Sequence, residues 1–156
     1  MKSLIICVSI IIILILNACS KSGDELPRDT NALLTGIRWE TVSVISRAGP
    51  AAPETDIFPS VPAFQRDDYL LFSMDSTYEL NDSELLRNDT AIRIIDAGKW
   101  HIEKDGNDEY LHMISNTFTT DYHPGKITLL NENSLEIERY YPSDQSLIRT
   151  RYRGDR

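Results

Sequence analysis

Three histidines lie eleven residues apart, at His101, His112 and His123, and they are the side chains best suited to bind a metal. The predicted pairing of residues 99–104 with residues 109–115 places His101 directly opposite His112, with Glu103 on the same face. Two imidazoles on facing strands can hold a divalent metal, but a protein site needs a third or fourth ligand. We therefore interpret His101 and His112 as a candidate pair only, and we predict no metal and no other cofactor.

The sequence selects no catalytic set. It has no serine elbow motif, no phosphate-binding glycine loop and no zinc-binding helix motif. Most aspartates fall in predicted turns, where they serve backbone geometry: Asp67, Asp68, Asp82, Asp89, Asp105 and Asp108. We predict that the protein is not an enzyme. A hydrolase is the less favoured alternative, because it would need two convergent carboxylates or a carboxylate–histidine pair in a cleft.

The other reactive group is Cys19, at the end of an apolar leader. Lys2 precedes an uncharged run from Leu4 to Leu16, which is shorter than the ~20 residues of a membrane-spanning helix and is typical of a removable secretory segment. The sequence Leu16-Asn17-Ala18-Cys19 resembles the lipobox of bacterial lipoproteins. The resemblance implies cleavage before Cys19 and its modification with diacylglycerol and palmitate-like acyl chains, which together anchor durably. An ordinary signal peptide and an N-terminal anchor helix are the alternatives.

The chain divides into three parts on this interpretation. Residues 1–18 are a lipoprotein signal peptide, residues 19–31 a lipidated flexible tether rich in polar residues, and residues 32–156 one domain. The lipobox resemblance predicts a lipid-anchored protein of the bacterial cell envelope, at the outer membrane, on its periplasmic or its surface face. The chain has 24 acidic and 16 basic residues and a net charge of −8, which disfavours nucleic-acid partners.

The pattern of the domain predicts strands joined by short turns. Trp39–Ser46 is rich in β-branched residues. We expect a first hairpin from Tyr69–Met74 and Thr77–Asn81, with Phe72 opposite Tyr78, Leu70 opposite Leu80, and Ser76 in the left-handed conformation. A short apolar stretch, Ile92–Asp96, follows.

Two further hairpins and a final strand complete the pattern. Lys99–Lys104 and Glu109–Ser115 flank an Asp-Gly turn, with Trp100 opposite Met113 and Ile102 opposite Leu111. Lys126–Leu130 and Ser134–Tyr141 flank a three-residue loop in which Asn133 can be left-handed, with Ile127 opposite Ile137 and Leu129 opposite Leu135. In Leu147–Arg153 the alternation puts Tyr152 on one face and Arg149, Arg151 and Arg153 on the other.

A proline-rich segment interrupts the strands at residues 47–66. Pro50, Pro53, Pro59 and Pro62 argue against regular pairing there. Such a long connection in a small domain is often a binding loop or lid, and packing on one edge is the equal alternative.

Together these elements predict an all-β fold, an antiparallel up-and-down barrel of about eight strands. The stretches Leu33–Val42, Tyr69–Tyr78 (close to a Phe-x-x-Asp-Gly-Thr-Tyr hairpin), Gly98–Trp100 and Lys126–Ile137 resemble the lipocalin-like lipoproteins of Bacteroidota. The resemblance implies a lipocalin-like barrel and a binding role, either for a small hydrophobic ligand or for another envelope protein.

Four aromatic residues fall on the predicted interior face: Trp39, Phe72, Tyr78 and Trp100. They could line a site for a small apolar molecule. They could also fill the barrel as a solid core, which we favour for these four residues, because side chains alone can just fill eight strands. A lined site would favour a ligand carrier, and a filled barrel would favour a protein–protein interaction module.

The lipobox interpretation predicts the behaviour of a single variant. Cys19→Ala removes the thiol that would carry the lipid, so we expect the protein to be unlipidated and to leave the membrane fraction. Fractionation of cells, followed by mass spectrometry of the N-terminal peptide, measures both. Unchanged membrane retention would discredit the lipobox.

Overall fold

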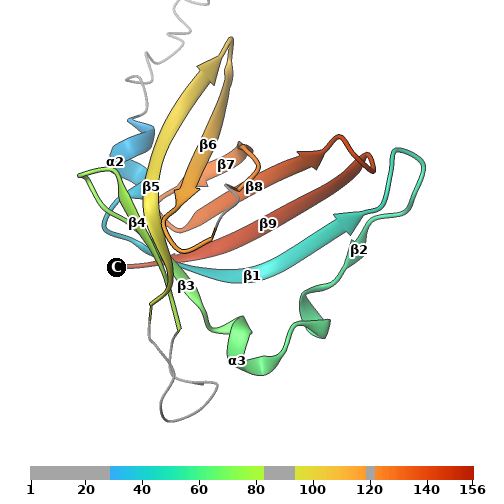
Figure 1. Cartoon of the computed structure of the whole chain (residues 1–156), viewed down its shortest axis with the longest axis horizontal. Coiled ribbons are helices and arrows are strands. Elements are labelled where there is room, and N and C mark those ends of the chain that lie inside the picture. Colours follow the sequence, from blue (N-terminus) through green and yellow to red (C-terminus); the bar gives the residue numbers. More distant parts are fainter. Residues whose placement is uncertain (1–28, 83–93, 119–121) are drawn as a thin grey trace, which may run out of the picture.

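Eight antiparallel strands follow one another in sequence order and close into a barrel, with a ninth short strand at the side (Figure 1). The computed structural model describes residues 29–82, 94–118 and 122–156. The long strands are β1 (Arg38–Arg47), β3 (Tyr69–Phe72), β4 (Thr77–Asn81), β5 (Ile94–Asp105), β6 (Asp108–Ser115), β7 (Gly125–Asn131), β8 (Ser134–Tyr141) and β9 (Ser146–Asp155). The predicted up-and-down, lipocalin-like barrel is confirmed.

Closure depends on β1, which pairs with β9 along its whole length, from Arg38 opposite Asp155 to Arg47 opposite Leu147. On its other side the first part of β1 pairs with β3, and the last part pairs with β2 (Thr55–Asp56). Because the first and last long strands pair, neither exposes an unpaired backbone edge at this junction. Exposed strand edges can pair with other molecules and promote aggregation.

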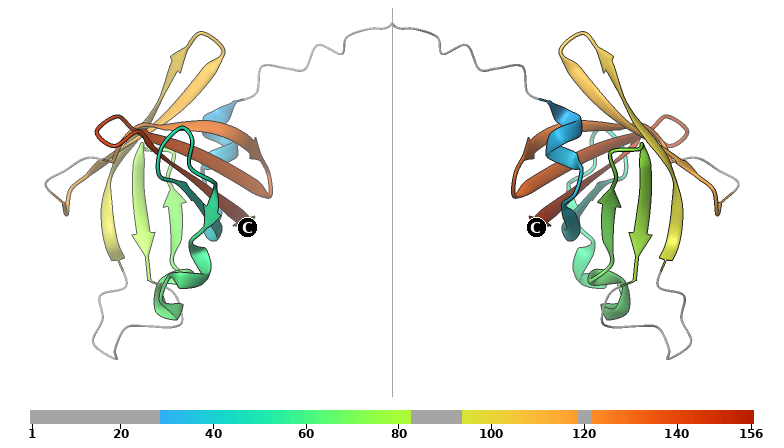
Figure 2. Two further views of the ribbon diagram at one scale, coloured as in Figure 1. Left: turned by 90° about the vertical axis from the view of Figure 1, so that its right-hand side faces the viewer. Right: turned by 90° about the vertical axis from the view of Figure 1, so that its left-hand side faces the viewer.

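Two helices mark the two ends of the barrel. Helix α2 (Thr30–Leu34) precedes β1, and its N-cap Asp29 accepts hydrogen bonds from the amides of Asn31 and Ala32. Helix α3 (Ala63–Arg66) precedes β3. Figure 2 shows α2 and α3 at opposite ends. We call the end at α2 the base and the end at α3 the mouth.

The predicted registers of the first two hairpins are confirmed. Phe72 lies opposite Tyr78 and Trp100 opposite Met113, and Ser76 has a φ of 64°. The strand predicted at Lys99 begins earlier, because β5 runs without a break from Ile94. Gly98 allows β6 to approach β5 closely at this point, because a Cβ on Gly98 would collide with the carbonyl oxygen of Ile114.

The third hairpin differs from the prediction in one detail. Ile127 lies opposite Ile137 as predicted, but a bulge at Thr128 shifts the remainder, so that Leu130 rather than Leu129 lies opposite Leu135. Leu130 is 4% exposed and Leu129 is 40% exposed. Pairing of Asn131 with Ser134 also shortens the turn to two residues. Among the described residues the non-glycine positive φ angles belong to Ser76 and Gln145, so the left-handed Asn133 was wrong.

The proline-rich segment is more regular than its composition suggests. Thr55 and Asp56 pair with Ser46 and Ile45 of β1 as strand β2, which the sequence reading excluded. The segment continues through a 3-10 helix, η1 (Phe58–Ser60), to α3. The prolines fall outside the two paired residues and so do not interrupt the ladder. The segment thus runs along the barrel wall and returns to the mouth.

The base of the barrel is filled by side chains. Trp39 and Phe72 are fully buried and Trp100 is 4% exposed. The indole of Trp39 donates to the carbonyl of Leu34 at 2.9 Å, which ties α2 to the barrel, and the indole of Trp100 donates to Ser73. Phe72 and Trp100 pack edge to face with ring centroids 5.4 Å apart. This aromatic cluster closes one end of the interior.

A substitution in this cluster tests the assigned interior face. Trp100→Ala removes the buried ring and its hydrogen bond, so we expect the free energy of unfolding to fall by ~3–5 kcal/mol. Met74→Ala, at a neighbouring side chain that is 86% exposed, should change it by less than about 0.5 kcal/mol. Urea denaturation of both variants measures the difference. Equal effects would contradict the assigned face.

Candidate functional site

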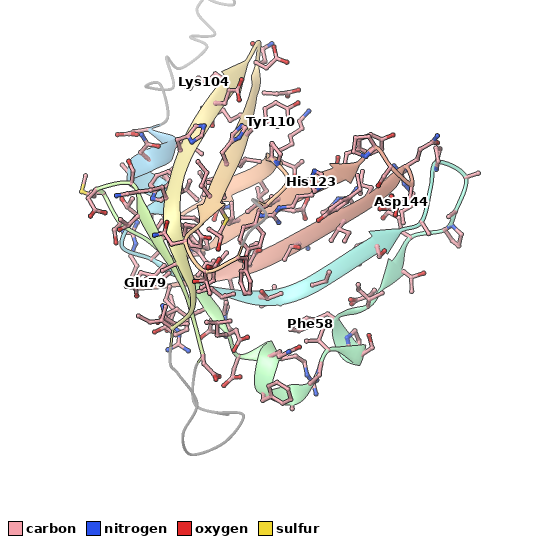
Figure 3. The ribbon with its side chains drawn as sticks, in the orientation of Figure 1. Phe58, Glu79, Lys104, Tyr110, His123 and Asp144 are labelled. Atoms are coloured by element: carbon pink, nitrogen blue, oxygen red, sulfur yellow. The ribbon has the colours of Figure 1, made fainter. Side chains whose placement is uncertain are left out.

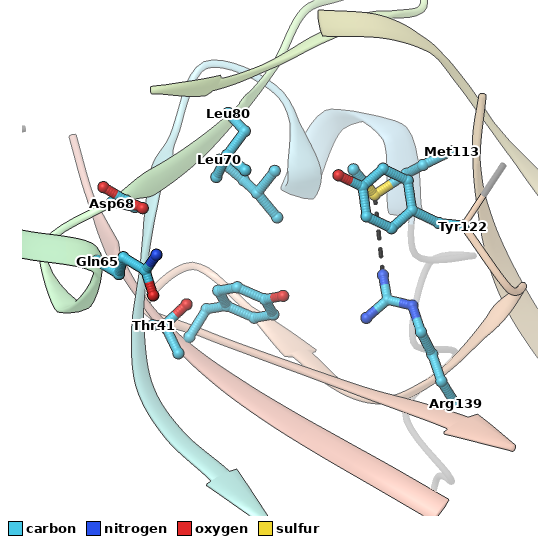
Figure 4. A pocket seen from close by; sticks show the side chains of 9 residues that line it. Thr41, Gln65, Asp68, Leu70, Leu80, Met113, Tyr122 and Arg139 are labelled. Carbon is cyan, nitrogen blue, oxygen red and sulfur yellow. Dashed lines mark hydrogen bonds between the residues drawn. The ribbon is translucent and has the colours of Figure 1, made fainter. Parts of the chain in front are cut away.

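The mouth of the barrel contains a cavity of about 200 Å³. Its walls come from six strands or strand ends, from the residues at α3, and from the connection between β6 and β7. The lining residues are Thr41, Gln65, Asp68, Leu70, Leu80, Met113, Tyr122, Arg139 and Tyr152. Figure 4 shows Gln65 and Asp68 on one side, with Met113, Tyr122 and Arg139 across from them. The site is therefore mixed in character, with apolar side chains between polar groups at both sides.

Arg139 brings a positive charge into this interior. It is 9% exposed, and it follows Leu135 and Ile137 on the inward face of β8. Its Nε donates to the carbonyl oxygen of His123 at 3.2 Å, and its Nη2 lies 3.9 Å from the sulfur of Met113. Neither acceptor is charged.

The arginines of β9 have a different environment. Arg149 contacts Glu54 and Glu138, Arg151 contacts Glu136, and Arg153 contacts Glu40, all at the outer surface. This agrees with the predicted outward face of the three arginines. Glutamates thus balance the charges of the exterior arginines, whereas Arg139, inside the mouth, has uncharged hydrogen-bond acceptors.

A buried carboxylate holds the part of the wall that contains Tyr122. Asp96 is fully buried and accepts hydrogen bonds from the hydroxyls of Tyr78 (2.6 Å), Ser115 (2.7 Å) and Tyr122 (3.0 Å). The tyrosine rings pack edge to face at 6.4 Å. Because the hydroxyl of Tyr122 is held by Asp96, its position in the wall is fixed.

The same network sets the acid–base properties of its members. Burial by itself would raise the pKa of Asp96, but hydrogen bonds from Tyr78, Ser115 and their neighbours lower this pKa below its ordinary value. Burial and the nearby charge of Asp96 raise the pKa of Tyr122 to about 12. Burial and the bond to Asp96 also raise the pKa of Tyr78. At neutral pH the carboxylate is therefore charged and both phenols are neutral.

The four aromatic residues predicted to line a ligand site do not border this cavity. Trp39, Phe72 and Trp100 lie in the base, and Tyr78 lies behind Tyr122, joined to it through Asp96. Trp100 borders a separate surface hollow near α2. The four residues share the interior as expected, and the open space lies beyond them at the mouth.

Sequence reasoning missed Arg139, Asp96 and Tyr122. Strand alternation offered a signal for two of them: Arg139 follows Leu135 and Ile137 at intervals of two, and Asp96 precedes Gly98 and Trp100 in the same way. A charged residue in an inward position is a candidate site residue. Tyr122 lies in a connection, where no period identifies the side that it faces.

The histidines lie outside the barrel. His101 and His112 stack with ring centroids 4.6 Å apart, and the Nε2 of His112 lies 2.8 Å from Glu103. The tip of the same hairpin carries an ion pair between Lys104 (Figure 3) and Glu109. His123 packs against Tyr141 instead. In the described part of the chain, no three His, Cys, Asp or Glu side chains are grouped to hold a metal.

Several sequence predictions fall on residues beyond the described ranges. The signal peptide 1–18, Cys19 and most of the tether 19–31 lie there, as does Asp89. Helix α2 begins at Thr30, within the predicted tether. None of the helices in the described ranges has the length and apolar character to cross a bilayer.

Comparison with known proteins gives no assignment: no protein-family model matches the chain, and no curated protein matches it in sequence.

The Asp96 network predicts acid sensitivity. Because the folded state holds the pKa of Asp96 below its unfolded value of about 3.9, the stability gained is complete above that value and is lost as the pH falls through the lower folded value. Asp96→Asn should lower the free energy of unfolding at pH 7 by about 1.5–3 kcal/mol, since charge-assisted hydrogen bonds are lost. The variant should also lose less further stability on acidification.

Urea denaturation at pH 7 and at pH 3 measures both effects. Asp105→Asn, at the exposed end of β5, is the matched control, and it should change stability at pH 7 by less than about 0.5 kcal/mol. The same acid loss in wild type and in Asp96→Asn would show that this network does not carry the effect.

Proposed function

We propose that this protein is a non-enzymatic lipoprotein of the bacterial cell envelope whose barrel binds a small hydrophobic ligand in the mouth cavity. The observation that carries the proposal is the contrast between the two ends: aromatic side chains fill the base, whereas a cavity of about 200 Å³ remains at the mouth. A filled barrel would need no such space. Ligand sites are commonly concave and mostly apolar, with a few fixed polar groups.

The size of the cavity limits the ligand. Drug-sized ligands occupy pockets of ~300–1,000 Å³, so a cavity of about 200 Å³ suits a smaller molecule or one end of a longer one. Leu70, Leu80 and Met113 supply the apolar surface. Gln65 and Asp68 lie at and just beyond the proline-rich segment, which therefore borders the entrance as a binding loop would.

The electrostatics favour binding over catalysis. A general acid or base works best with a pKa near the operating pH. The network at the cavity wall has the opposite arrangement, because the pKa of Asp96 is lowered while that of Tyr122 is raised to about 12. The carboxylate–histidine pair of Glu103 and His112 lies on the outer face of its hairpin. Asp96 and Tyr122 therefore serve to hold the cavity wall in place.

The proposal of membrane attachment is based on the N-terminal apolar leader. We infer that Cys19 carries the lipid and that residues up to α2 connect the anchor to the barrel, most simply at the outer membrane. The net charge of −8 supports this setting over one with nucleic acid, since like charges repel.

A protein–protein interaction module is the second candidate, and one observation favours it. Ile94, Ile114 and Phe118 are each 43–50% exposed. They lie at the same end of the β5–β6 pair, because the amide of Asn116 donates to the carbonyl of Ala97 there. Exposed apolar groups that cluster often mark contact surfaces. These residues are separate from the mouth cavity, so the two candidates can be tested independently.

The methionines allow a direct test of ligand binding. The chain has three: Met113 lines the cavity, Met74 is 86% exposed, and Met1 starts the leader. In full-length protein labelled with [methyl-13C]methionine and held in a neutral maltoside detergent, octan-1-ol should shift the Met113 methyl resonance to saturation. The Met74 resonance should stay in place as an internal control.

A variant that fills the cavity tests the same proposal. Leu80→Trp should weaken octan-1-ol binding at least tenfold, whereas Met74→Trp adds the same ring outside and should have no effect. A Met113 resonance that never moves would count against the ligand-carrier proposal and leave the interaction surface as the better candidate.

A further inference from the structure

We propose that the ligand of the mouth cavity is a small amphipathic carboxylate, whose charged group binds the guanidinium of Arg139. This deepens the proposed function and rests on it, since it assumes that the cavity takes a ligand. The inference adds the charge of the ligand, its orientation and the residue that selects it.

Arg139 is charged at any physiological pH, and it is more than nine-tenths buried. A charge removed from water is costly unless it is paired and hydrogen-bonded. Within the described residues its contacts are the carbonyl of His123 and the sulfur of Met113, and no carboxylate forms an ion pair with it. A guanidinium has five N–H donors. The buried carboxylate of Asp96 is held by three hydroxyls, so the guanidinium has donors left for a ligand.

The side chain is held in place for this task. Gly125 lies opposite Arg139 in the β7–β8 pair, and a Cβ on Gly125 would lie 2.2 Å from a methyl group of Ile137 and 3.5 Å from the Nε of Arg139. The missing Cβ makes room for Ile137, and the stem of Arg139 passes over Gly125 at ordinary van der Waals distance. The bond from Nε to His123 then fixes the plane of the guanidinium. A prearranged cation loses little freedom on binding, which favours affinity.

The chemistry points to a carboxylate in particular. The fork of an arginine matches the two oxygens of a carboxylate and can bind both. One guanidinium balances one negative charge, whereas a phosphate monoester carries ~1.5–2. Leu70, Leu80 and the ring of Tyr152 form the surface that the apolar part of the ligand would cover.

Asp68 sets the orientation. It lines the cavity across from Arg139 (Figure 4), so a negative group is attracted to the Arg139 side and repelled from the Asp68 side. Tyr122 borders Arg139 but donates its hydroxyl to Asp96, so it presents a ring and leaves the binding of the anion to Arg139. The carboxylate would therefore lie on the Arg139 side of the cavity, with the tail directed toward α3.

The test compares octanoate with octan-1-ol at pH 7.5, using the Met113 methyl shift of full-length protein and free ligand concentrations measured by equilibrium dialysis. Hydrogen bonds to a charged group are worth ~1.5–3 kcal/mol, so octanoate should bind roughly 10- to 100-fold more tightly. Arg139→Met should remove this preference and leave octan-1-ol affinity within about threefold. Arg151→Met removes the same charge from the outer surface and should leave the preference intact.

The outcomes separate the two proposals. Binding of both ligands with equal affinity to wild type would overturn the carboxylate inference and keep the ligand carrier, and this comparison needs no variant that might misfold. An octanoate preference that survives in folded Arg139→Met would also overturn it. Failure of both ligands to move the Met113 resonance would overturn both proposals.

Discussion

The pairing of β1 with β9 is the constraint on which the rest of the structure depends. It joins the first long strand to the last and assigns every strand an inner and an outer face. With the ladder closed, Tyr152 must point inward and its neighbours Arg151 and Arg153 outward. The same closure encloses the inward-facing side chains in one interior volume, which these side chains can either fill or leave partly empty.

The chain does both, and the division follows from the placement of large and small groups. Trp39, Phe72 and Trp100 occupy the end where the turns are tight. Gly154 makes room for Trp39, because a Cβ there would lie 3.0 Å from its indole. At the mouth the inward residues are leucines, a methionine and charged groups, which pack less completely. Stability is therefore concentrated at the base, where packing can be tight without interfering with the cavity.

Local patterning predicted most of the fold. Alternation with short turns was sufficient for the registers of Phe72 with Tyr78 and of Trp100 with Met113, because a shift by one residue would have exposed the apolar faces. The bulge at Thr128 was not predictable, since a bulge is a local compromise between twist and pairing that leaves no mark in composition. The site was harder still. The cavity depends on what several strands leave unfilled, and the position of Tyr122 depends on a bond to Asp96 that joins residues 26 apart.

The seam between β6 and β7 has a consequence for motion. The two strands share two residue pairs, Tyr110 with Lys126 and Leu111 with Gly125, whereas β5 and β6 share eight. Few ladder bonds mean a low free energy of local opening. This seam is therefore where the barrel would open most readily, and transient separation of the two strands would give a second route to the interior that leaves the entrance at α3 undisturbed.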